Sequence, residues 1–438
     1  MNIFKAVFKW KLRLIASWVL KFHKPVIIAI TGSVGKTSTR ITIESILHKN
    51  YRVSRSQDNF NNEFGLPFTI LGVPAGINRI VLPIAAAFYF FKSIFSQRYP
   101  EVLVLEMGAD RPGDIAYLTK IAKPHIAVVT RIGHSHTEFF GDLASVQREK
   151  GELIRALPKD GIAVLNADDP RVLAMQNLHN KGRVIKYGFS ETSDVLAENY
   201  SVAPIELESG VTSEIEYGMR IDLVYKSERS KASLKGMIGR PAAYAVLSAI
   251  SVALAMKIPM SRIFQALSEL KPQPGRLRII AGIKHTLLID DSYNASPESI
   301  AEALRLLTQV RGRRKIAVLG DMLELGQATE QLHRTVGKLA ADLQVDLLFT
   351  VGLRAKFIAE EARLAGIAKT KVKEFESVFE AGLELQNRLK EGDVVLIKGS
   401  QGIRMEKIVE EVMAFPNKAG ELLCRQSKGW KRKLVASA

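Results

Sequence analysis

Cysteine is almost absent from this chain: Cys424 is the only one among 438 residues. A single cysteine excludes an intramolecular disulfide and any cysteine-rich zinc site, and it suits a reducing compartment. Long apolar runs are also missing. Residues 80–95 are nearly all apolar, but the run is short and contains a proline, and residues 1–24 are interrupted by charge. Neither a membrane-spanning helix nor a signal peptide is therefore expected.

Acidic residues are too few to balance the basic ones: 45 face 62, for a net charge of +17. This predicts attraction to an acidic partner, namely nucleotides, nucleic acid or an anionic membrane. No nucleic-acid-reading module is recognisable, so nucleic acid is not expected as a partner. Residues 1–24 contain no acid, and residues 424–438 are basic around Trp430. We expect the latter to be a solvated terminus.

Two interpretations stay open for each of the two apolar segments, residues 1–24 and residues 80–95. Residues 1–24 suit either a basic helix on a membrane surface or a helix packed on the first domain. Residues 80–95 suit either a buried helix or a helix that docks on a membrane. We expect a monomeric cytoplasmic protein, and the membrane interpretations of these two segments would place it at the inner face of the membrane.

The most informative stretch is residues 26–38, VIIAITGSVGKTS. Its β-branched run predicts a buried strand, and the residues from Lys36 to about Asn50 predict a helix. A strand, a Gly-x-x-Gly-Lys-Thr turn and a helix form a phosphate-binding loop, in which Lys36 reaches outer phosphates and the Thr37 hydroxyl ligates Mg²⁺. The expected nucleotide contacts are Gly32, Ser33, Val34, Gly35, Lys36, Thr37 and Ser38.

Strands and helices alternate along the rest of the chain, which predicts an α/β protein with a central, doubly wound, mostly parallel sheet. Residues 186–235 predict an antiparallel appendage, and the proline- and glycine-rich residues 271–276 a linker. A smaller Rossmann-like α/β domain follows, with strands expected at 287–291, 315–320, 346–351 and 394–398 and without the glycine fingerprint of dinucleotide binding. The expected organisation is a basic amphipathic segment, two domains and a basic tail, at 1–24, 25–271, 272–415 and 416–438.

Several motifs in order resemble the Mur ligases, most closely their D-alanyl-D-alanine-adding members. They cover about residues 25–412 and are TGSVGKTS (31–38), NNEFGLP (61–67), EMGADRPGDIAYLTKIAKP (106–124), RIGHSHTEFFG (131–141), EKGELI (149–154), PGRLR (274–278), IDDSYNASPES (289–299), LGDMLELG (319–326) and IKGSQGIRME (397–406).

The resemblance implies an ATP-dependent amide ligase of cell-wall precursor synthesis. A peptide carboxylate becomes an acyl phosphate, and D-alanyl-D-alanine is added to a UDP-muramoyl-tripeptide. ATP and two Mg²⁺ ions are the implied cofactors. The implied catalytic residues are Lys36, Glu106, His136 and Lys150, and the implied metal ligands are Thr37, Glu106 and His136.

Other roles also follow from the resemblance alone. Lys150 matches a lysine that the family carbamylates, although the bare pattern predicts an ordinary surface lysine. His134 is expected to be accessory. Arg276, Asn294 and Asp321 match positions that close on ATP, and the substrate-facing matches are Asn61, Asn62, Ser400 and Arg404.

The sequence departs from the family in two places. Only about 24 residues precede the first strand, where the family has a domain that holds the UDP-sugar, so the usual grip on uridine is expected to be missing. Pro241, Ala242 and Ala245 stand where the family commonly has His-Asn and a further Asn near the base. A different carboxylate and amine, of the folylpolyglutamate, cyanophycin or lipid-linked kind, and a non-catalytic nucleotide-binding scaffold remain alternatives.

Overall fold

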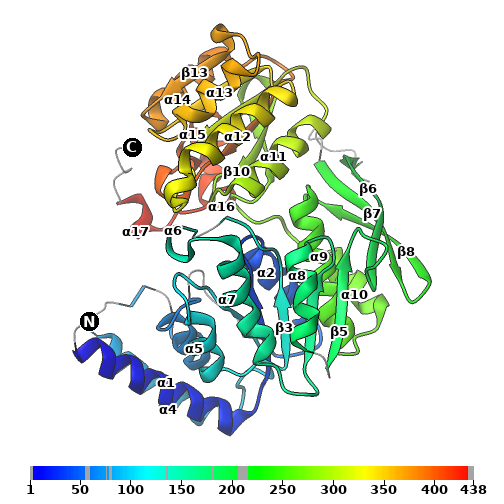
Figure 1. Cartoon of the computed structure of the whole chain (residues 1–438), viewed down its shortest axis with the longest axis vertical. Coiled ribbons are helices and arrows are strands. Elements are labelled where there is room, and N and C mark those ends of the chain that lie inside the picture. Colours follow the sequence, from blue (N-terminus) through cyan, green and yellow to red (C-terminus); the bar gives the residue numbers. More distant parts are fainter. Residues whose placement is uncertain are drawn as a thin grey trace.

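The chain forms two α/β domains that face each other across a cleft (Figure 1). This computed structural model describes residues 3–54, 60–74, 76–77, 81–134, 137–179, 182–205 and 216–432. The predicted fold class is confirmed: a larger sheet carries the phosphate loop, and a smaller sheet follows it along the chain.

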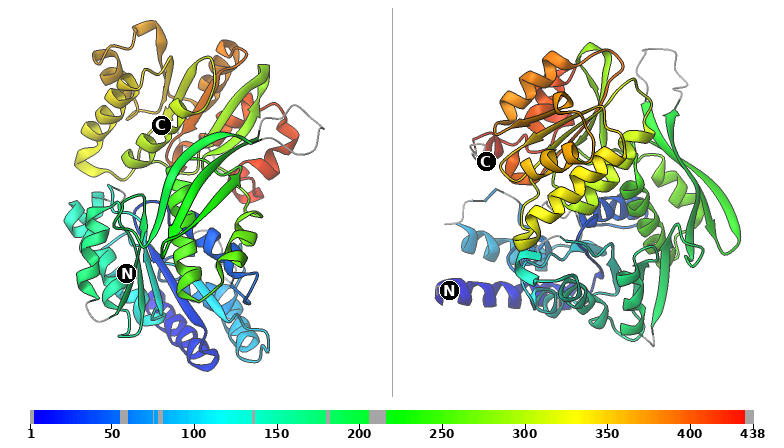
Figure 2. Two further views of the ribbon diagram at one scale, coloured as in Figure 1. Left: turned by 90° about the vertical axis from the view of Figure 1, so that its right-hand side faces the viewer. Right: turned by 45° about the horizontal axis from the view of Figure 1, so that its top comes forward.

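The first domain contains an eight-stranded sheet in the order β2-β1-β3-β4-β5-β6-β7-β8. The first six strands in this order form five parallel pairs, and β7 pairs antiparallel with both β6 and β8. The predicted appendage is therefore antiparallel but continuous with the main sheet, and its strands extend along one side toward the second domain (Figure 2). The strands are β1 (Val26–Thr31), β2 (Val102–Glu106), β3 (Ile126–Val129), β4 (Ile162–Asn166), β5 (Arg183–Gly188), β6 (Val195–Ile205), β7 (Glu216–Tyr225) and β8 (Glu228–Lys235).

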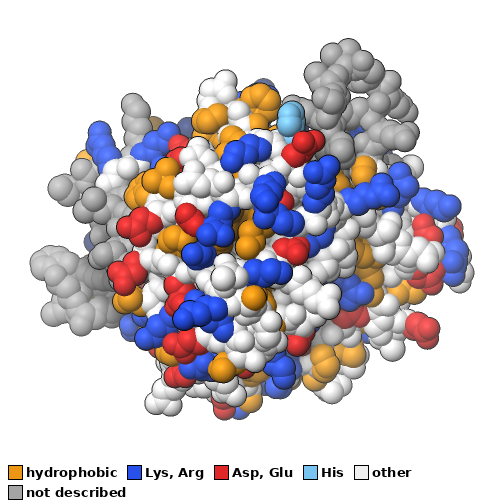
Figure 3. All heavy atoms as spheres, turned by 90° about the horizontal axis from the view of Figure 1, so that it is seen from above, with side chains coloured by type: hydrophobic (Ala, Val, Ile, Leu, Met, Phe, Trp, Pro, Cys, Tyr) orange, Lys and Arg blue, Asp and Glu red, His pale blue; other side chains and the backbone are white. Residues whose placement is uncertain are grey.

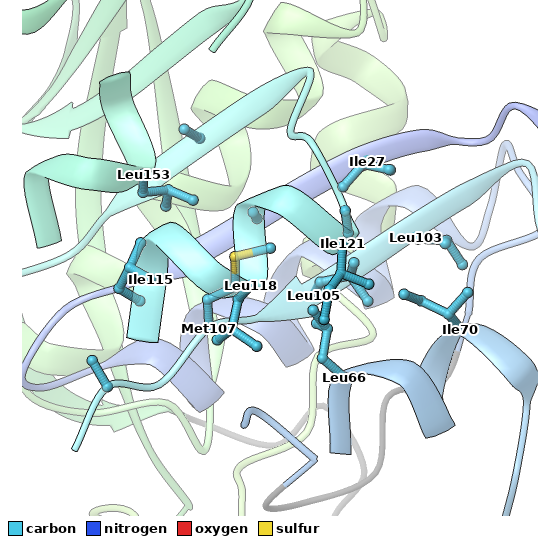
Figure 4. Packing of buried hydrophobic residues seen from close by; sticks show 14 of the residues in the cluster. Ile27, Leu66, Ile70, Leu103, Leu105, Met107, Ile115, Leu118, Ile121 and Leu153 are labelled. Carbon is cyan, nitrogen blue, oxygen red and sulfur yellow. The ribbon is translucent and has the colours of Figure 1, made fainter. Parts of the chain in front are cut away.

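Helices cover both faces of this sheet because its central strands are apolar on both sides. Ile27 and Leu103 point to the face where α3 and α5 pack, together with Leu118 of α5 (Figure 4). Ile28 and Val104, one residue along, point to the opposite face. The first face carries α3 (Gly65–Leu71), α5 (Asp114–Ile121) and α7 (Leu143–Arg155), and the second carries α2 (Lys36–Leu47), α9 (Arg240–Ala255) and α10 (Met260–Leu267). Short helices α6 (Thr137–Phe140) and α8 (Pro170–Leu173) complete the domain.

The second domain has a six-stranded sheet in the order β13-β12-β11-β14-β10-β9. All neighbours are parallel except β9, which runs antiparallel to β10. The predicted strands are present, and the structure adds the edge strands β9 and β13. The strands are β9 (Arg278–Gly282), β10 (Thr286–Asp291), β11 (Lys315–Gly320), β12 (Leu347–Val351), β13 (Val372–Phe375) and β14 (Val394–Lys398). One face carries α11 (Pro297–Gln309), α12 (Thr329–Asp342) and α13 (Lys356–Leu364), and the other α14 (Val378–Arg388), α15 (Glu406–Val412) and α16 (Ala419–Leu422).

The two apolar segments, residues 1–24 and 80–95, form helices on the outside of the first domain. Helix α1 (Ile3–His23) buries Leu12, Ala16 and Val19 against the domain and packs beside α4 (Leu82–Ile94). The buried-helix interpretation of residues 80–95 is wrong, because only Ala86 and Ser93 of α4 are buried. No helix in the part of the chain that the structure describes is long and apolar enough to span a bilayer.

The basic tail is not simply solvated. Cys424 and Arg425 are buried, and the Arg425 guanidinium donates to Oε2 of Glu406 at 3.0 Å. Arg425 also donates to the Ser292 carbonyl at 3.1 Å and to the carbonyl of Tyr293. The prediction of a solvated terminus is therefore wrong for these residues. The short helix α17 (Lys428–Lys431) follows them.

Candidate active site

The phosphate loop joins β1 to α2 in the predicted conformation. Gly32 and Gly35 adopt φ values of 144° and 90°, and a Cβ on Gly32 would lie 2.1 Å from the Thr130 hydroxyl oxygen. Glycine is therefore required at position 32. The Lys36 ammonium donates to the Gly32 carbonyl of the same loop at 2.7 Å. We expect it to exchange this hydrogen bond for one to a phosphate oxygen when a nucleotide binds. Desolvation and the nearby Arg276 lower the pKa of Lys36, while Glu106 and Asp110 oppose that shift.

Glu106 ends β2 beside the loop, as the parallel pairing of β1 and β2 requires. The Thr37 hydroxyl lies 3.2 and 3.1 Å from its two carboxylate oxygens, so it donates to this carboxylate. Nε of Arg40 lies 3.6 Å from Oε2 of Glu106. A hydroxyl and a carboxylate that meet at the rim of a nucleotide loop are hard oxygen donors of the kind that Mg²⁺ prefers.

Lys150 lies behind this rim, in α7. Its side chain is 2% exposed, so the surface-lysine interpretation is wrong. Burial lowers the pKa of Lys150 to about 7, and repulsion by Lys36 adds to the shift, while Glu149, Asp110 and Asp114 oppose it. Glu149 is fixed by the amides of Gly113 and Ile115, at 2.8 and 2.7 Å, at the start of α5. A buried amine with this pKa has a large neutral fraction near neutral pH.

The second domain brings a buried ion pair to the opposite wall. Asp291 and Lys398 occupy adjacent positions at the ends of the parallel strands β10 and β14. The Lys398 ammonium donates to Oδ2 of Asp291 at 2.5 Å and to the Asn294 carbonyl at 2.9 Å. The Arg276 guanidinium lies 4.2 Å from the ring centroid of Tyr293, on the same side of the cleft.

The two walls enclose a cleft of about 940 Å³ that most of the predicted residues line. From the first domain these are the loop residues 33–38, Asn61, Asn62 and Glu106; from the linker and second domain they are Arg276, Asn294, Ser400 and Arg404. Tertiary structure thus brings together stretches that are hundreds of residues apart. Sequence inspection did not single out several further lining residues as members of a site, namely Asp110, Asp114, Tyr117, Asp291, Tyr293 and Lys398. Charged residues at the ends of buried strands were the available signal for Asp291 and Lys398.

Several of the predicted site residues use their side chains in hydrogen bonds or ion pairs within the protein. The Asn62 side chain accepts from the amides of Phe64 and Gly65, at 3.2 and 2.9 Å, where α3 begins. Ser400 accepts from the Leu323 amide at 2.9 Å, and Arg404 pairs with the buried Glu406 at 2.5 Å. Asp321 is fully buried below the cleft, where it accepts from the Arg354 and Ala355 amides at 2.9 and 2.6 Å.

His136 lies outside the described residues. Within the described part of the chain, no three His, Cys, Asp or Glu side chains form a group that could hold a metal by themselves. His134 does have a clear position. Its Nδ1 lies 2.6 Å from Oε1 of Glu298, and its amide donates to the same oxygen at 2.9 Å. Since Glu298 lies in the first turn of α11, His134 joins the two domains at one end of the cleft.

Pro241 and Ala242, at the position of the family departure, also line the cleft. They lie in the first turn of α9, and Met237, Ile238 and Leu270 line the same cleft. The part of the cleft near the start of α9 is therefore more apolar than the part near the phosphate loop.

A phosphate loop and a carboxylate on one domain, facing cationic residues of a second α/β domain across one cleft, define a two-domain nucleotide-dependent enzyme. Residues 30–253 match the Mur ligase middle domain, and residues 275–401 match the Mur ligase glutamate ligase domain. The chain belongs to the Mur ligase family.

Its relatives point to one branch of that family. A UDP-N-acetylmuramoyl-tripeptide–D-alanyl-D-alanine ligase of Bacillus subtilis is 30% identical over 399 residues, which cover 89% of this chain and 76% of that protein. The enzyme of the same name from Mycobacterium tuberculosis is 31% identical over 408 residues, or 89% and 73%. The crystal structure of MurF ligase from Thermotoga maritima in complex with ADP has a TM-score of 0.76 and 27% identity, covering 92% of this chain and 83% of that one.

Proposed function

We propose that this protein is an ATP-dependent amide ligase that adds D-alanyl-D-alanine to a UDP-muramoyl-tripeptide in the cytoplasm. The observation that carries the proposal is the cleft between the domains, which is lined by the phosphate loop on one side and by Arg276, Asn294 and Lys398 on the other. The relatives that this chain resembles over about nine-tenths of its length carry that activity in their names.

The proposed reaction has two steps. A carboxylate oxygen of the peptide attacks the γ-phosphorus of ATP, ADP leaves, and an acyl phosphate forms. The free amine of the dipeptide then attacks the carbonyl carbon, loses a proton, and expels phosphate to leave an amide. Both the carboxylate and the triphosphate are anionic, so their approach requires positive charge on the cleft walls. Lys36 and Arg276 supply it from opposite sides.

Thr37 and Glu106 would hold Mg²⁺, since both present oxygen atoms to the cleft beside the loop. Bound there with the nucleotide, the ion would neutralise phosphate charge. A second Mg²⁺ near His136 stays a prediction from the resemblance.

Carbamylation of Lys150 is part of the proposal. The reaction with CO₂ requires a neutral amine, and the lowered pKa of Lys150 provides one near neutral pH. The product would be an anion beside Lys36. The repulsion between the Lys36 and Lys150 ammonium groups would then become an attraction between the Lys36 ammonium and the carbamate. Closure of the second domain, joined by the His134–Glu298 contact, would keep water from the acyl phosphate.

The test is turnover with defined substrates. Purified protein receives ATP, Mg²⁺, UDP-muramoyl-tripeptide and D-alanyl-D-alanine, and phosphate release is followed together with the product mass. Release that requires both the tripeptide and the dipeptide, with one amide product, supports the proposal. Release with a different acid or amine would favour the folylpolyglutamate-like or cyanophycin-like alternative. ATP binding without release for any acceptor would favour a non-catalytic scaffold.

A further inference from the structure

Helix α1 has two apolar stripes, and only one of them is covered. Leu12, Ala16 and Val19 face the first domain. The second stripe is exposed to solvent and includes Trp18, 66% exposed, and Phe22, 64% exposed. Its members repeat every three or four residues, so they share one side of the helix: Val7, Trp10, Leu14, Trp18 and Phe22.

Helix α4 presents a similar stripe. Its exposed apolar side chains again recur at helical spacing, and Phe95, just beyond the helix, is 78% exposed. The other members of the stripe are Ile84, Phe88 and Phe91. Large aromatic side chains in water along a whole helix are unusual for a surface without a partner.

The two helices form one surface. They pack side by side along the lower edge of the first domain (Figures 1 and 2). His23 at the end of α1 contacts the Ser93 carbonyl of α4 at 2.7 Å, and its ring stacks on Tyr99 at 4.2 Å. Each helix is therefore fixed by contacts on the side opposite to its exposed apolar stripe. We refer to the exposed side chains of α1 and α4 as the α1–α4 surface.

The charge of this surface has one sign. Residues 1–24 and 80–98 contain no Asp or Glu, and the exposed cations beside the apolar stripes are Lys11, Lys21, Lys24, Lys92 and Arg98. The outer face of the second domain differs, because acidic side chains are interspersed among the basic ones there (Figure 3). Aromatic side chains flanked only by cations are complementary to the interface of an anionic bilayer, where rings lie at headgroup level and lysines reach phosphates.

We propose that the α1–α4 surface docks this protein on an anionic lipid bilayer, with both helices lying in the plane of the interface. This goes beyond the ligase activity. The described helices are too short or too charged to cross a bilayer, which agrees with docking. Helix α1 also borders the cleft, but with the side opposite to its exposed stripe, since Lys9 lies 4.1 Å from the ring centroid of Tyr117, a cleft-lining residue. Docking through the exposed stripe would therefore leave Lys9 and the cleft on the side of α1 that faces away from the lipid.

Vesicle flotation tests the proposal. The full chain should float with vesicles of phosphatidylglycerol and phosphatidylcholine and bind at least about tenfold less to pure phosphatidylcholine, with binding weakened by salt. Trp10 and Trp18 are two of only three tryptophans. Their emission should shift to shorter wavelength on binding, and the shift should persist in Trp430→Phe.

Paired variants separate the surface from general hydrophobicity. Trp18→Glu with Phe88→Glu should reduce binding to anionic vesicles at least about tenfold. Phe379→Glu with Leu383→Glu makes the same chemical change at exposed apolar sites of α14 and should leave binding unchanged. Lys11→Glu with Lys21→Glu should abolish the preference for anionic lipid, whereas Lys231→Glu on β8 should not.

Two results would overturn the proposal. The first is failure of the protein to float with any vesicle. The second is a dimer in solution, seen by light scattering, that Trp18→Glu dissociates. A second copy of the chain would then cover the α1–α4 surface in place of a bilayer. Ligase turnover on soluble substrates without vesicles should be unchanged in Trp18→Glu with Phe88→Glu. Loss of membrane binding and loss of ligase activity are thus independent outcomes.

Discussion

His134 of the first domain and Glu298 of the second lie 2.6 Å apart, from Nδ1 to Oε1. The same carboxylate oxygen accepts from the His134 amide, so one side chain of α11 is fixed twice by a loop that follows β3. A second pair, Arg131 and Glu302, lies 3.6 Å apart on the neighbouring turn of α11. These contacts hold the two walls of the cleft together at one end.

Removing the first contact should weaken nucleotide capture. In Glu298→Ala we expect a several-fold higher KM for ATP and a loss of about 1–3 kcal/mol in the free energy of unfolding, because His134 loses both hydrogen bonds. Steady-state kinetics and urea unfolding measure the two effects. Glu360→Ala removes an exposed partner of Arg334 and serves as the control. Equal effects in both variants would refute a role for the contact between domains.

The same contact predicts a pH dependence. Burial raises the pKa of Glu298, but the hydrogen bonds from His134 outweigh it and hold the pKa below its usual range. The carboxylate form is thus favoured in the folded protein. Its stabilising contribution is present above the unfolded pKa of about 4.5 and is lost as the pH falls through the lowered value. After correction for the intrinsic exchange rate at each pH, the protection of amides at the start of α11 should fall in that acidic window, and it should already be low in Glu298→Ala.

Lys36→Ala should abolish turnover and leave the fold intact. The ammonium of Lys36 bonds only to carbonyls of its own loop, Gly32 and Ser33, among the hydrogen bonds described for it, so the core does not depend on it. We expect phosphate release to fall by about 10³-fold or more, since charge on the transferred phosphoryl group loses its nearest cation. Circular dichroism and the melting temperature should stay close to those of the parent. Lys123→Ala, at an exposed lysine, should retain full activity, and turnover of Lys36→Ala at the parent rate would remove the assignment.

Lys150 should form a carbamate in a pH-dependent way. Since its pKa is about 7, the neutral amine increases through that value and predominates at pH 8. With ¹³C-bicarbonate we expect a carbamate resonance that strengthens from pH 6 to pH 8. The resonance should be absent in Lys150→Met and present in Lys123→Met. No resonance at pH 8 would contradict the proposed modification.

Without bicarbonate, Lys150 should also make stability depend on pH. Between about pH 7 and 10.5 the unfolded chain binds a proton that the folded chain does not, so the free energy of unfolding should rise with pH. Lys150→Met should lack this rise. Urea unfolding at several pH values measures the difference between the two proteins.

Lys398→Met should destabilise the second domain. It leaves the buried carboxylate of Asp291 without its partner, and loss of one member of a buried ion pair costs about 3–5 kcal/mol. Burial raises the pKa of Asp291, and Lys398 opposes that shift. In the variant the pKa should rise further, so the stability deficit should shrink as the pH falls. Asp291→Asn combined with Lys398→Met should recover part of the loss in urea unfolding; no recovery would show that Lys398 acts through other contacts.

The sequence predicted best what lies within one short segment. The phosphate loop follows from thirteen consecutive residues, because the strand, the glycine turn and the helix start form through local contacts. The resemblance assigned Glu106 to the same site, and in the structure its carboxylate accepts a hydrogen bond from the Thr37 hydroxyl at the end of that loop. The β/α rhythm likewise predicted both sheets.

Edge strands were harder to predict. Strands β9 and β13 are short and lie at the two edges of their sheet, where only one side of each strand pairs with another strand of the sheet. Lys373 and Glu374 also interrupt the apolar pattern of β13. Their existence depends on the neighbours β10 and β12, which the local sequence does not specify.

Burial was decided by tertiary structure alone. Lys150 is enclosed because α7 packs on α5, and Asp291 meets Lys398 because β10 and β14 pair in one register across more than a hundred residues. Residues 80–95 likewise show that the sequence alone does not decide whether a side chain is buried. Periodicity showed that the segment is apolar, but whether another element covers an apolar stripe depends on where the rest of the chain packs. By itself the sequence determined the local phosphate site and the α/β class. Only the folded arrangement decided which charges share the cleft and which apolar stripes face solvent.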